Sequence, residues 1–202
     1  TLKAAYLKDF LNKESEYLAL AQLLLLNKNP YWAADVITSG QKKMVTIVDE
    51  ETKEEKVEPV VKDTEKNLKL LADSWRMAQE IDKAIPVLEK SAKMSKKGTS
   101  YVILGNLYLS EDRVDKAIEA INKGLEKGDI KNISQVYLTL GQAHFELQNF
   151  DEARKNFRIA ARDKKKSIKT QANTWLKYTE NEEIRVKNLA LRRDFIQQNT
   201  SS

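Results

Sequence analysis

The stretch YLTLGQAH at residues 137–144, followed by ARKNF at 153–157, decides the fold of this chain. An earlier stretch, YVILGNLY at 101–108 followed by AIEAI at 117–121, matches it at each large and each small position. In both copies the alanine follows the glycine by twelve residues. A pattern that recurs with a fixed internal spacing predicts structural repeats, and neighbouring copies are expected to stack on one another.

Two further copies stand earlier in the chain. They are LKLLADSW at 68–75 with AIPVL at 84–88, and YLALAQLL at 17–24 with AADVI at 33–37. In each copy a small residue on the first segment is matched by an alanine on the second, where only a small side chain lets two helix backbones cross closely. These repeat-defining pairs are Ala21 with Ala33, Ala72 with Ala84, Gly105 with Ala117, and Gly141 with Ala153.

The composition favours helices as well. The chain has 202 residues with only three Pro and six Gly, and residue types with a high helix propensity are abundant. The four-copy pattern resembles the tetratricopeptide repeat (TPR) over about residues 15–162. This resemblance implies an all-α fold, an α-α superhelix or solenoid of antiparallel helix pairs. It also implies a protein that binds other proteins and carries no catalytic machinery.

We expect residues 1–202 to form a single domain. Because a helical pattern begins directly after Thr1, the chain looks like part of a longer protein whose start is missing. The C-terminal part shows two helical patterns, 168–178 and 182–198, of which the first suits a polar cap for the solenoid. The expected order is a trailing helix of a preceding repeat at 1–12, repeats at 13–40, 64–97, 98–132 and 133–163, an insertion at 41–63, and capping helices at 167–202.

The insertion lengthens one repeat well beyond the others. Its β-branched residues cluster at 44–48 and 57–61, on either side of a polar run at 49–56. Clusters of this kind, separated by charged residues, predict a β-hairpin at about 42–62. A disordered insertion is the alternative reading of the same residues.

Candidate catalytic groups are few. The chain has no Cys, which excludes disulfides, thiolate metal sites and cysteine nucleophiles. His144 is the only histidine, and it holds the aromatic position of its repeat, so it is expected to pack between helices. We find no metal-ligand spacing, phosphate-binding glycine loop or nucleophile elbow. The sequence therefore predicts a protein that is not an enzyme and needs no cofactor or metal.

The resemblance also implies where a ligand binds. In TPR proteins the first helices of successive repeats line a concave groove, and the positions around the small residue contact a peptide. Mapped onto this chain, these positions predict a protein or peptide partner. The expected groove residues are Lys66, Lys69, Asp73, Arg76, Thr99, Val102, Asn106, Leu109, Gln135, Leu138, Gln142, Phe145 and Glu146.

The formal net charge of +5 is concentrated in the C-terminal part of the chain. A basic segment could bind phosphates or anionic lipid heads, which keeps nucleic-acid or anionic-surface binding open as an alternative. Nucleic acid is the less expected ligand, because no aromatic residue suited to base stacking is interleaved. The basic residues of this segment are Arg154, Lys155, Arg158, Arg162, Lys164, Lys165, Lys166 and Lys169.

The first and last expected helices have no visible neighbours in the sequence, which leaves a homo-oligomer open.

In its overall residue pattern, the chain is also similar to the C-terminal part of TPR proteins from Gram-negative bacteria that accompany TonB, ExbB and ExbD. The features that carry this similarity are Leu-rich first helices, the AIPVL segment at 84–88 and a closing Trp175-x-x-Tyr178. It implies a periplasmic scaffold that supports TonB-dependent uptake. A cytoplasmic TPR adaptor is the alternative.

Overall fold

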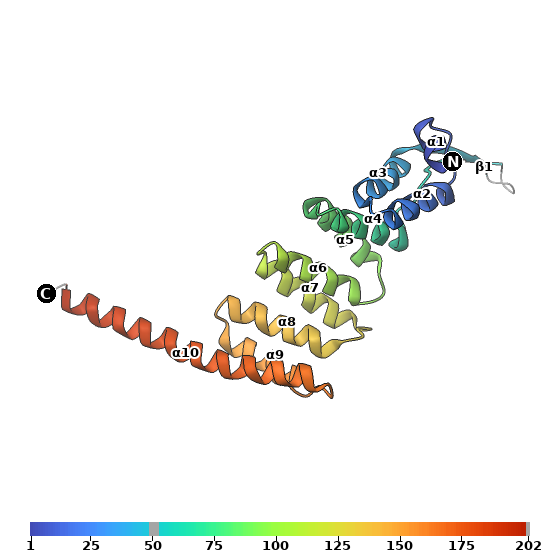
Figure 1. The fold of residues 1–202 in the computed structure, drawn as a ribbon. Coiled ribbons are helices and arrows are strands. Elements are labelled where there is room, and N and C mark those ends of the chain that lie inside the picture. The colour runs from blue at the N-terminus through green and yellow to red at the C-terminus, as the bar shows by residue number, and fades with distance from the viewer. Residues whose placement is uncertain (49–52, 201–202) are drawn as a thin grey trace. The chain divides into compact units, whose positions relative to one another are not determined.

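The computed structural model describes residues 1–48 and 53–200, and most of these residues are helical (Figure 1). The chain divides into two compact units, Thr1–Lys96 and Lys97–Ser202, called the N-terminal unit and the C-terminal unit below. Within each unit, antiparallel helix pairs stack on one another. The predicted solenoid of helix pairs is therefore confirmed.

The N-terminal unit contains two helix pairs. The first is α2 (Glu14–Leu26) with α3 (Pro30–Lys42), and the second is α4 (Glu65–Met77) with α5 (Ile81–Met94); α3 packs on α4. A short helix, α1 (Leu2–Leu7), contacts α2. The predicted helix reaching Phe10 is too long, because the chain turns at Asp9, which has a φ of 56°.

The C-terminal unit continues the same arrangement. It pairs α6 (Thr99–Ser110) with α7 (Val114–Lys127), and α8 (Ile133–Glu146) with α9 (Phe150–Ala160), and ends with α10 (Lys166–Thr200). The second helix of each pair packs against the next helix along the chain, α7 on α8 and α9 on α10. Within this unit, α8 and α10 therefore each pack against the second helix of the preceding pair.

The small residues of the motif lie where the helices of a pair come closest. A Cβ atom added at Gly105 would stand 2.5 Å from Ile121 Cγ1 and 3.1 Å from the Ala117 carbonyl oxygen. One added at Gly141 would stand 2.5 Å from the ring of Phe157. The two distances of 2.5 Å are shorter than real Cβ contacts, so a larger residue at either position would force Ile121 or Phe157 to shift. The six alanines of the repeat-defining pairs are all buried.

All four helix pairs turn in the same way. The turn holds a residue in the left-handed region, at Lys28, Gln79, Asp112 and Gln148, with φ between 54° and 62°. The N–H of the next residue then donates to the carbonyl of the last large residue of the first-helix motif, for example Glu80 to Trp75 at 2.9 Å and Asn149 to His144 at 2.8 Å. This is the Schellman arrangement that ends many helices. None of the four residues is glycine, so the turn carries no obvious signal in the sequence.

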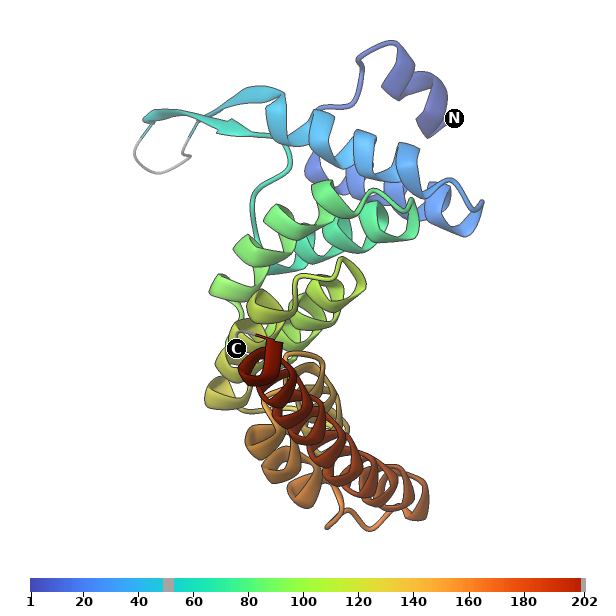
Figure 2. The same cartoon turned by 90° about the vertical axis from the view of Figure 1, so that its left-hand side faces the viewer.

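The predicted hairpin is confirmed, and the disordered alternative is wrong for its described part. Strands β1 (Met44–Val48) and β2 (Glu55–Pro59) pair antiparallel, from Met44 opposite Pro59 to Val48 opposite Glu55. Figure 2 shows the hairpin projecting from the helices of the N-terminal unit. The predicted tip includes residues 49–52, which lie outside the described residues.

Backbone and side-chain hydrogen bonds fix the base of the hairpin. The Val61 N–H donates to the Gly40 carbonyl at 3.0 Å, and Lys43 Nζ reaches the Leu11 carbonyl at 2.9 Å. The Glu14 carboxylate accepts from the Lys62 N–H at 3.0 Å and from Asn67 Nδ2 at 2.7 Å. Because Glu14, Gly40 and Asn67 belong to α2, α3 and α4, the insertion is attached firmly at its root even though its strands are mostly exposed.

One continuous helix, α10, stands where the sequence predicts two capping helices, so that prediction is wrong. Between Tyr178 and Glu182 the chain has no Gly or Pro to end a helix, and Thr179 is completely buried. Residues 166–183, the docked half, pack on α8 and α9, whereas residues 184–199, the projecting half, run out beyond them (Figure 1). Residues 201–202, the end of the predicted cap, lie outside the described residues.

Candidate functional site

Three side-chain amides repeat at one position along the C-terminal unit. Asn106 on α6, Gln142 on α8 and Asn173 on α10 each follow directly the small residue at which their helix crosses its neighbour. Asn106 and Asn173 are exposed, and Gln142 is half-buried. Since the first helices stack in order, equivalent positions recur along one face of the solenoid. We call Asn106, Gln142 and Asn173 the amide row.

The third amide, Asn173, was not predicted, because it lies in the segment expected to form only a cap. The signal was nevertheless present. Ile168, Ala172 and Trp175 hold the large, small and aromatic positions of a first-helix motif, and Ala172 is completely buried like the other small residues. The docked half of α10 is thus the first helix of a further repeat, and it extends the face by Asn173 together with the exposed Lys169 and Lys177.

An aromatic cluster holds the docked half in place. Trp175 stacks on Phe157 with ring centroids 5.7 Å apart, and Phe145 lies 5.4 Å from Trp175 and 5.2 Å from Tyr178. Figure 2 shows α10 lying over the α8–α9 pair. Phe145 is half-buried in this cluster, so its main contacts are within the chain.

The remaining predicted groove residues of the C-terminal unit differ in exposure. Gln135 and Glu146 are exposed, and Leu109, Thr99 and Val102 are half-buried. Leu138 is completely buried among Phe157, Ala160 and Ala172. Its assignment to the groove is wrong, because the packing of α10 on the α8–α9 pair covers it.

The predicted residues on α4 belong to the N-terminal unit. Lys66 and Lys69 are exposed. Asp73 and Arg76 form an ion pair of 3.2 Å along the helix. These four residues form a charged strip on one helix, separate from the amide row.

His144 is a packing residue in the structure. Burial lowers the pKa of its imidazole, against the weaker opposing effect of Glu152. Its Nδ1 atom is buried, and no hydrogen-bond partner reaches it in the described part of the chain. The described residues contain no group of three His, Asp or Glu side chains able to hold a metal ion.

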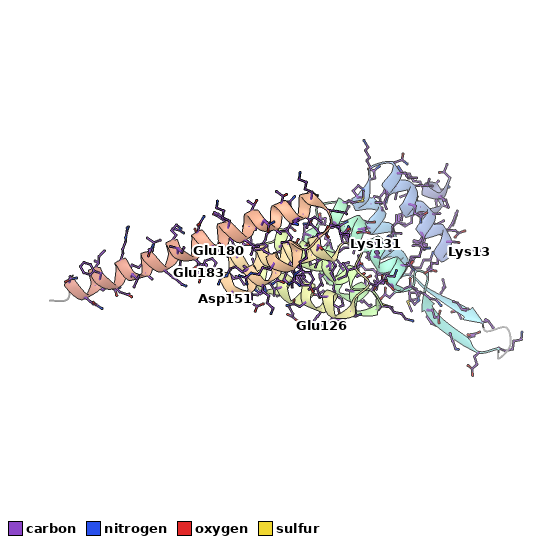
Figure 3. The ribbon with its side chains drawn as sticks, turned by 90° about the horizontal axis from the view of Figure 1, so that it is seen from below. Lys13, Glu126, Lys131, Asp151, Glu180 and Glu183 are labelled. Carbon is purple, nitrogen blue, oxygen red and sulfur yellow. The ribbon has the colours of Figure 1, made fainter. Side chains whose placement is uncertain are left out.

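Acidic side chains gather where α9 meets the end of the docked half. Figure 3 labels Asp151 on α9 with Glu180 and Glu183 on α10. Arg154 forms ion pairs with Asp151 and Glu183, and its side chain is only 16% exposed. These pairs raise the pKa of the Arg154 guanidinium, with Glu183 as the main cause. The ion pair between Arg154 and Glu183 thus joins α9 to the end of the docked half.

Comparison with known families identifies the repeats. A model of the tetratricopeptide repeat matches residues 98–126 and 134–161. These two segments correspond to the α6–α7 and α8–α9 pairs, the two copies in which glycine occupies the small position. The TPR fold is a protein-interaction scaffold that is generally not enzymatic.

Solved structures, two of them of named TPR proteins, share the fold at low sequence identity. MamA from Desulfovibrio magneticus RS-1 aligns with a TM-score of 0.62 and 12% identity over 93% of this chain and 94% of its own. YrrB, a TPR protein with an unusual peptide-binding site, aligns with a TM-score of 0.60 and 14% identity over 90% and 84%. The TPR2B domain of yeast Sti1, solved in complex with a pHsp70 ligand, aligns with a TM-score of 0.50 and 14% identity over 58% and 97%.

Two further findings bear on identity. No curated protein matches the sequence of this chain. Within residues 1–48 and 53–200, no helix combines the length and the apolar character needed to cross a membrane. The solved structures thus supply the fold of this chain.

Proposed function

We propose that this protein is a non-enzymatic scaffold that binds an extended peptide segment of a partner protein along the amide row of its C-terminal unit. The observation that carries the proposal is the recurrence of a side-chain amide at one position of α6, α8 and α10. The amides of Asn106, Gln142 and Asn173 make no hydrogen bond with another described residue, so each is available to a ligand.

An amide row suits a peptide backbone. Each Asn or Gln amide offers two N–H donors and a carbonyl acceptor, which match the alternating C=O and N–H groups of an extended chain. Backbone recognition of this kind gives affinity with little demand on the sequence of the peptide, whereas neighbouring side chains supply specificity. The neighbours here are Lys169 and Lys177 on α10 and Glu146 on α8, all exposed.

Two TPR structures similar to this chain support peptide binding as the activity. YrrB has a peptide-binding site, and the Sti1 domain was solved with a pHsp70 ligand. The basic residues near Asn173 favour a peptide with acidic side chains or a free carboxylate at the end that meets α10.

For the cellular setting, we propose the periplasm of a Gram-negative bacterium, with a component of the TonB system as partner. The support for this setting is the sequence resemblance to TonB-associated TPR proteins. A cytoplasmic adaptor is the competing proposal. Binding of an anionic surface through Lys164, Lys165 and the basic residues around them is a second one.

The experiment is a pull-down from a membrane and periplasmic extract of a Gram-negative bacterium. The parent chain is compared with a variant in which Asn106, Gln142 and Asn173 are changed to Ala. We expect the parent to retain a partner that the variant loses by at least about tenfold, because three hydrogen-bonding groups of roughly 0.5–1.5 kcal/mol each are removed.

The matched control removes three amides outside the row. Asn122, Asn132 and Gln171 are exposed, and Asn132 makes no capping hydrogen bond at the start of α8. Changing these three to Ala should leave capture intact. Equal capture by the parent and the row variant would refute the amide row as the binding site. A capture that disappears steeply with added salt, in both variants alike, would support the basic segment instead.

A further inference from the structure

A row of apolar side chains runs beside the amide row in the C-terminal unit. Leu109 on α6, Phe145 on α8 and Leu176 on α10 each stand three residues after an amide of the row. Residues three apart are neighbours on a helix surface, so each of these apolar side chains lies next to an amide. We call Leu109, Phe145 and Leu176 the apolar row.

The apolar row is not closed off in the core. Leu104 on α6 and Leu140 on α8, which hold motif positions, are only 3% exposed. Leu109, Phe145 and Leu176 also pack against buried core residues, but they stay half-buried. Each therefore keeps apolar surface that a ligand can cover, and removing such surface from water is favourable.

The same pairing of an amide with an apolar residue is interrupted in the N-terminal unit. On α2, Gln22 is exposed and Leu25 is half-buried at the two equivalent positions. On the next first helix, α4, these positions hold Asp73 and Arg76, which form an ion pair along the helix. Within the described residues, three successive first helices carry both rows only in the C-terminal unit.

The spacing of the first helices decides which peptide conformation can follow the apolar row. Helices α8 and α10 contact each other, and the axes of packed helices lie about 8–10 Å apart. A polyproline II segment has three residues per turn and rises about 3.1 Å per residue, so its side chains recur on one side every ~9 Å. A β-strand repeats after about 6.6 Å, which is too short to reach the next helix. Polyproline II is therefore the conformation that matches the row.

We propose that the apolar row selects the ligand, and that the partner segment is a polyproline II stretch with an apolar residue at every third position. Its apolar side chains rest on Leu109, Phe145 and Leu176. The amides of the neighbouring row bind its backbone, which makes no internal hydrogen bonds in this conformation. This inference rests on the proposed function, because it needs the peptide to lie along the amide row.

The first experiment compares two fluorescein-labelled peptides of equal length and composition, built from leucine, proline and serine. The first peptide has leucine at every third position, and the second has its leucines at every second position. Only one leucine of the second peptide can meet the apolar row at a time. We expect the parent chain to bind the first peptide at least about tenfold more tightly in fluorescence anisotropy, because fewer apolar contacts form with the second. This comparison changes only the peptide, so it does not depend on the folding of a variant.

The second experiment changes the row itself. Leu109→Gln should weaken binding of the first peptide by about tenfold. The matched control is Leu125→Gln, because Leu125 is half-buried and packs against the same core cluster as Leu109 but lies on α7, outside both rows. The control should bind like the parent. An equal loss in both variants would show that Leu109 acts only through the core, which would overturn the inference.

Equal binding of the two peptides by the parent, or no binding of either, would also overturn the inference. The variant with Asn106, Gln142 and Asn173 changed to Ala separates this failure from failure of the proposed function. If that variant still loses the partner in the pull-down, the amide row stands without the apolar row. If it binds the first peptide as tightly as the parent does, both proposals fail.

Discussion

The docked and projecting halves of α10 form one helix without a break, yet they differ in what stabilises them. The docked half buries Ile168, Ala172 and Thr179 against the α8–α9 pair. The projecting half has similar helix-forming residues, but its apolar side chains face solvent. The difference shows that helix propensity is a local property, whereas stability in the native state comes from the neighbour that covers one face.

The largest expected contrast compares one phenylalanine near each half. Phe157 is completely buried and stacks on Trp175, so Phe157→Ala should lower the free energy of unfolding of the C-terminal unit by about 3–5 kcal/mol. Phe195 is 69% exposed, so Phe195→Ala should change it by less than about 0.5 kcal/mol. Urea denaturation at low protein concentration measures both values.

Hydrogen exchange would then locate the effect of Phe157→Ala. Amides of residues 166–183 should lose protection together, because the aromatic cluster that holds the docked half loses its centre. Protection that persists there in Phe157→Ala would contradict the assignment of this cluster as the anchor of α10.

A smaller effect on stability is expected from the single histidine, His144, because its protonation depends on pH. Burial lowers the pKa of His144, so the unfolded chain binds a proton more readily than the folded unit. With respect to His144, the free energy of unfolding has its full value above the unfolded pKa of about 6.5, and it decreases as the pH falls below that value. Unfolding midpoints in urea should therefore decrease between about pH 7.5 and pH 5.5.

The control for this pH dependence is His144→Phe, which keeps an aromatic ring at the motif position. This variant should remove most of the decrease in the unfolding midpoint. It also removes the buried Nδ1 atom, which has no hydrogen-bond partner among the described residues. An equal decrease in parent and variant would show that groups other than His144 are responsible.

The smallest expected effect lies at the junction of the two halves. Hydrogen bonds from Lys187 and then Arg154 lower the pKa of the Glu183 carboxyl. A carboxylate of lowered pKa stabilises the folded state above its ordinary value of about 4.3, and this contribution is lost as the pH falls through the folded pKa. Amide protection around residues 180–186 should therefore weaken in acid.

Glu183→Gln provides the comparison for the junction. Because the amide does not titrate, the variant should have weaker protection at neutral pH and little further loss in acid. A loss in acid of the same size in parent and variant would exclude Glu183 as the titrating group, while leaving the docking of residues 166–179 unaffected.

Most of the fold could be predicted from the repeating motif. The small residues at the crossings, the helix pairs and the hairpin follow from residue size and local pattern, and two of the three amides follow from the register of the TPR resemblance. Asn173 was not predicted, because Gln171 stands where the other copies have a leucine, so residues 168–175 depart from the repeating motif. The left-handed turns at Lys28, Gln79 and Gln148 had no glycine to reveal them.

The sequence by itself determined the register of the repeats, because a fixed spacing between small residues admits one way of crossing two helices. Only the tertiary structure decided that α10 is a single helix, that Leu138 lies under it, and where its burial ends. The physical reason is the range of the interactions. A motif reports contacts within one helix pair, whereas burial depends on whether a further element stacks on that pair.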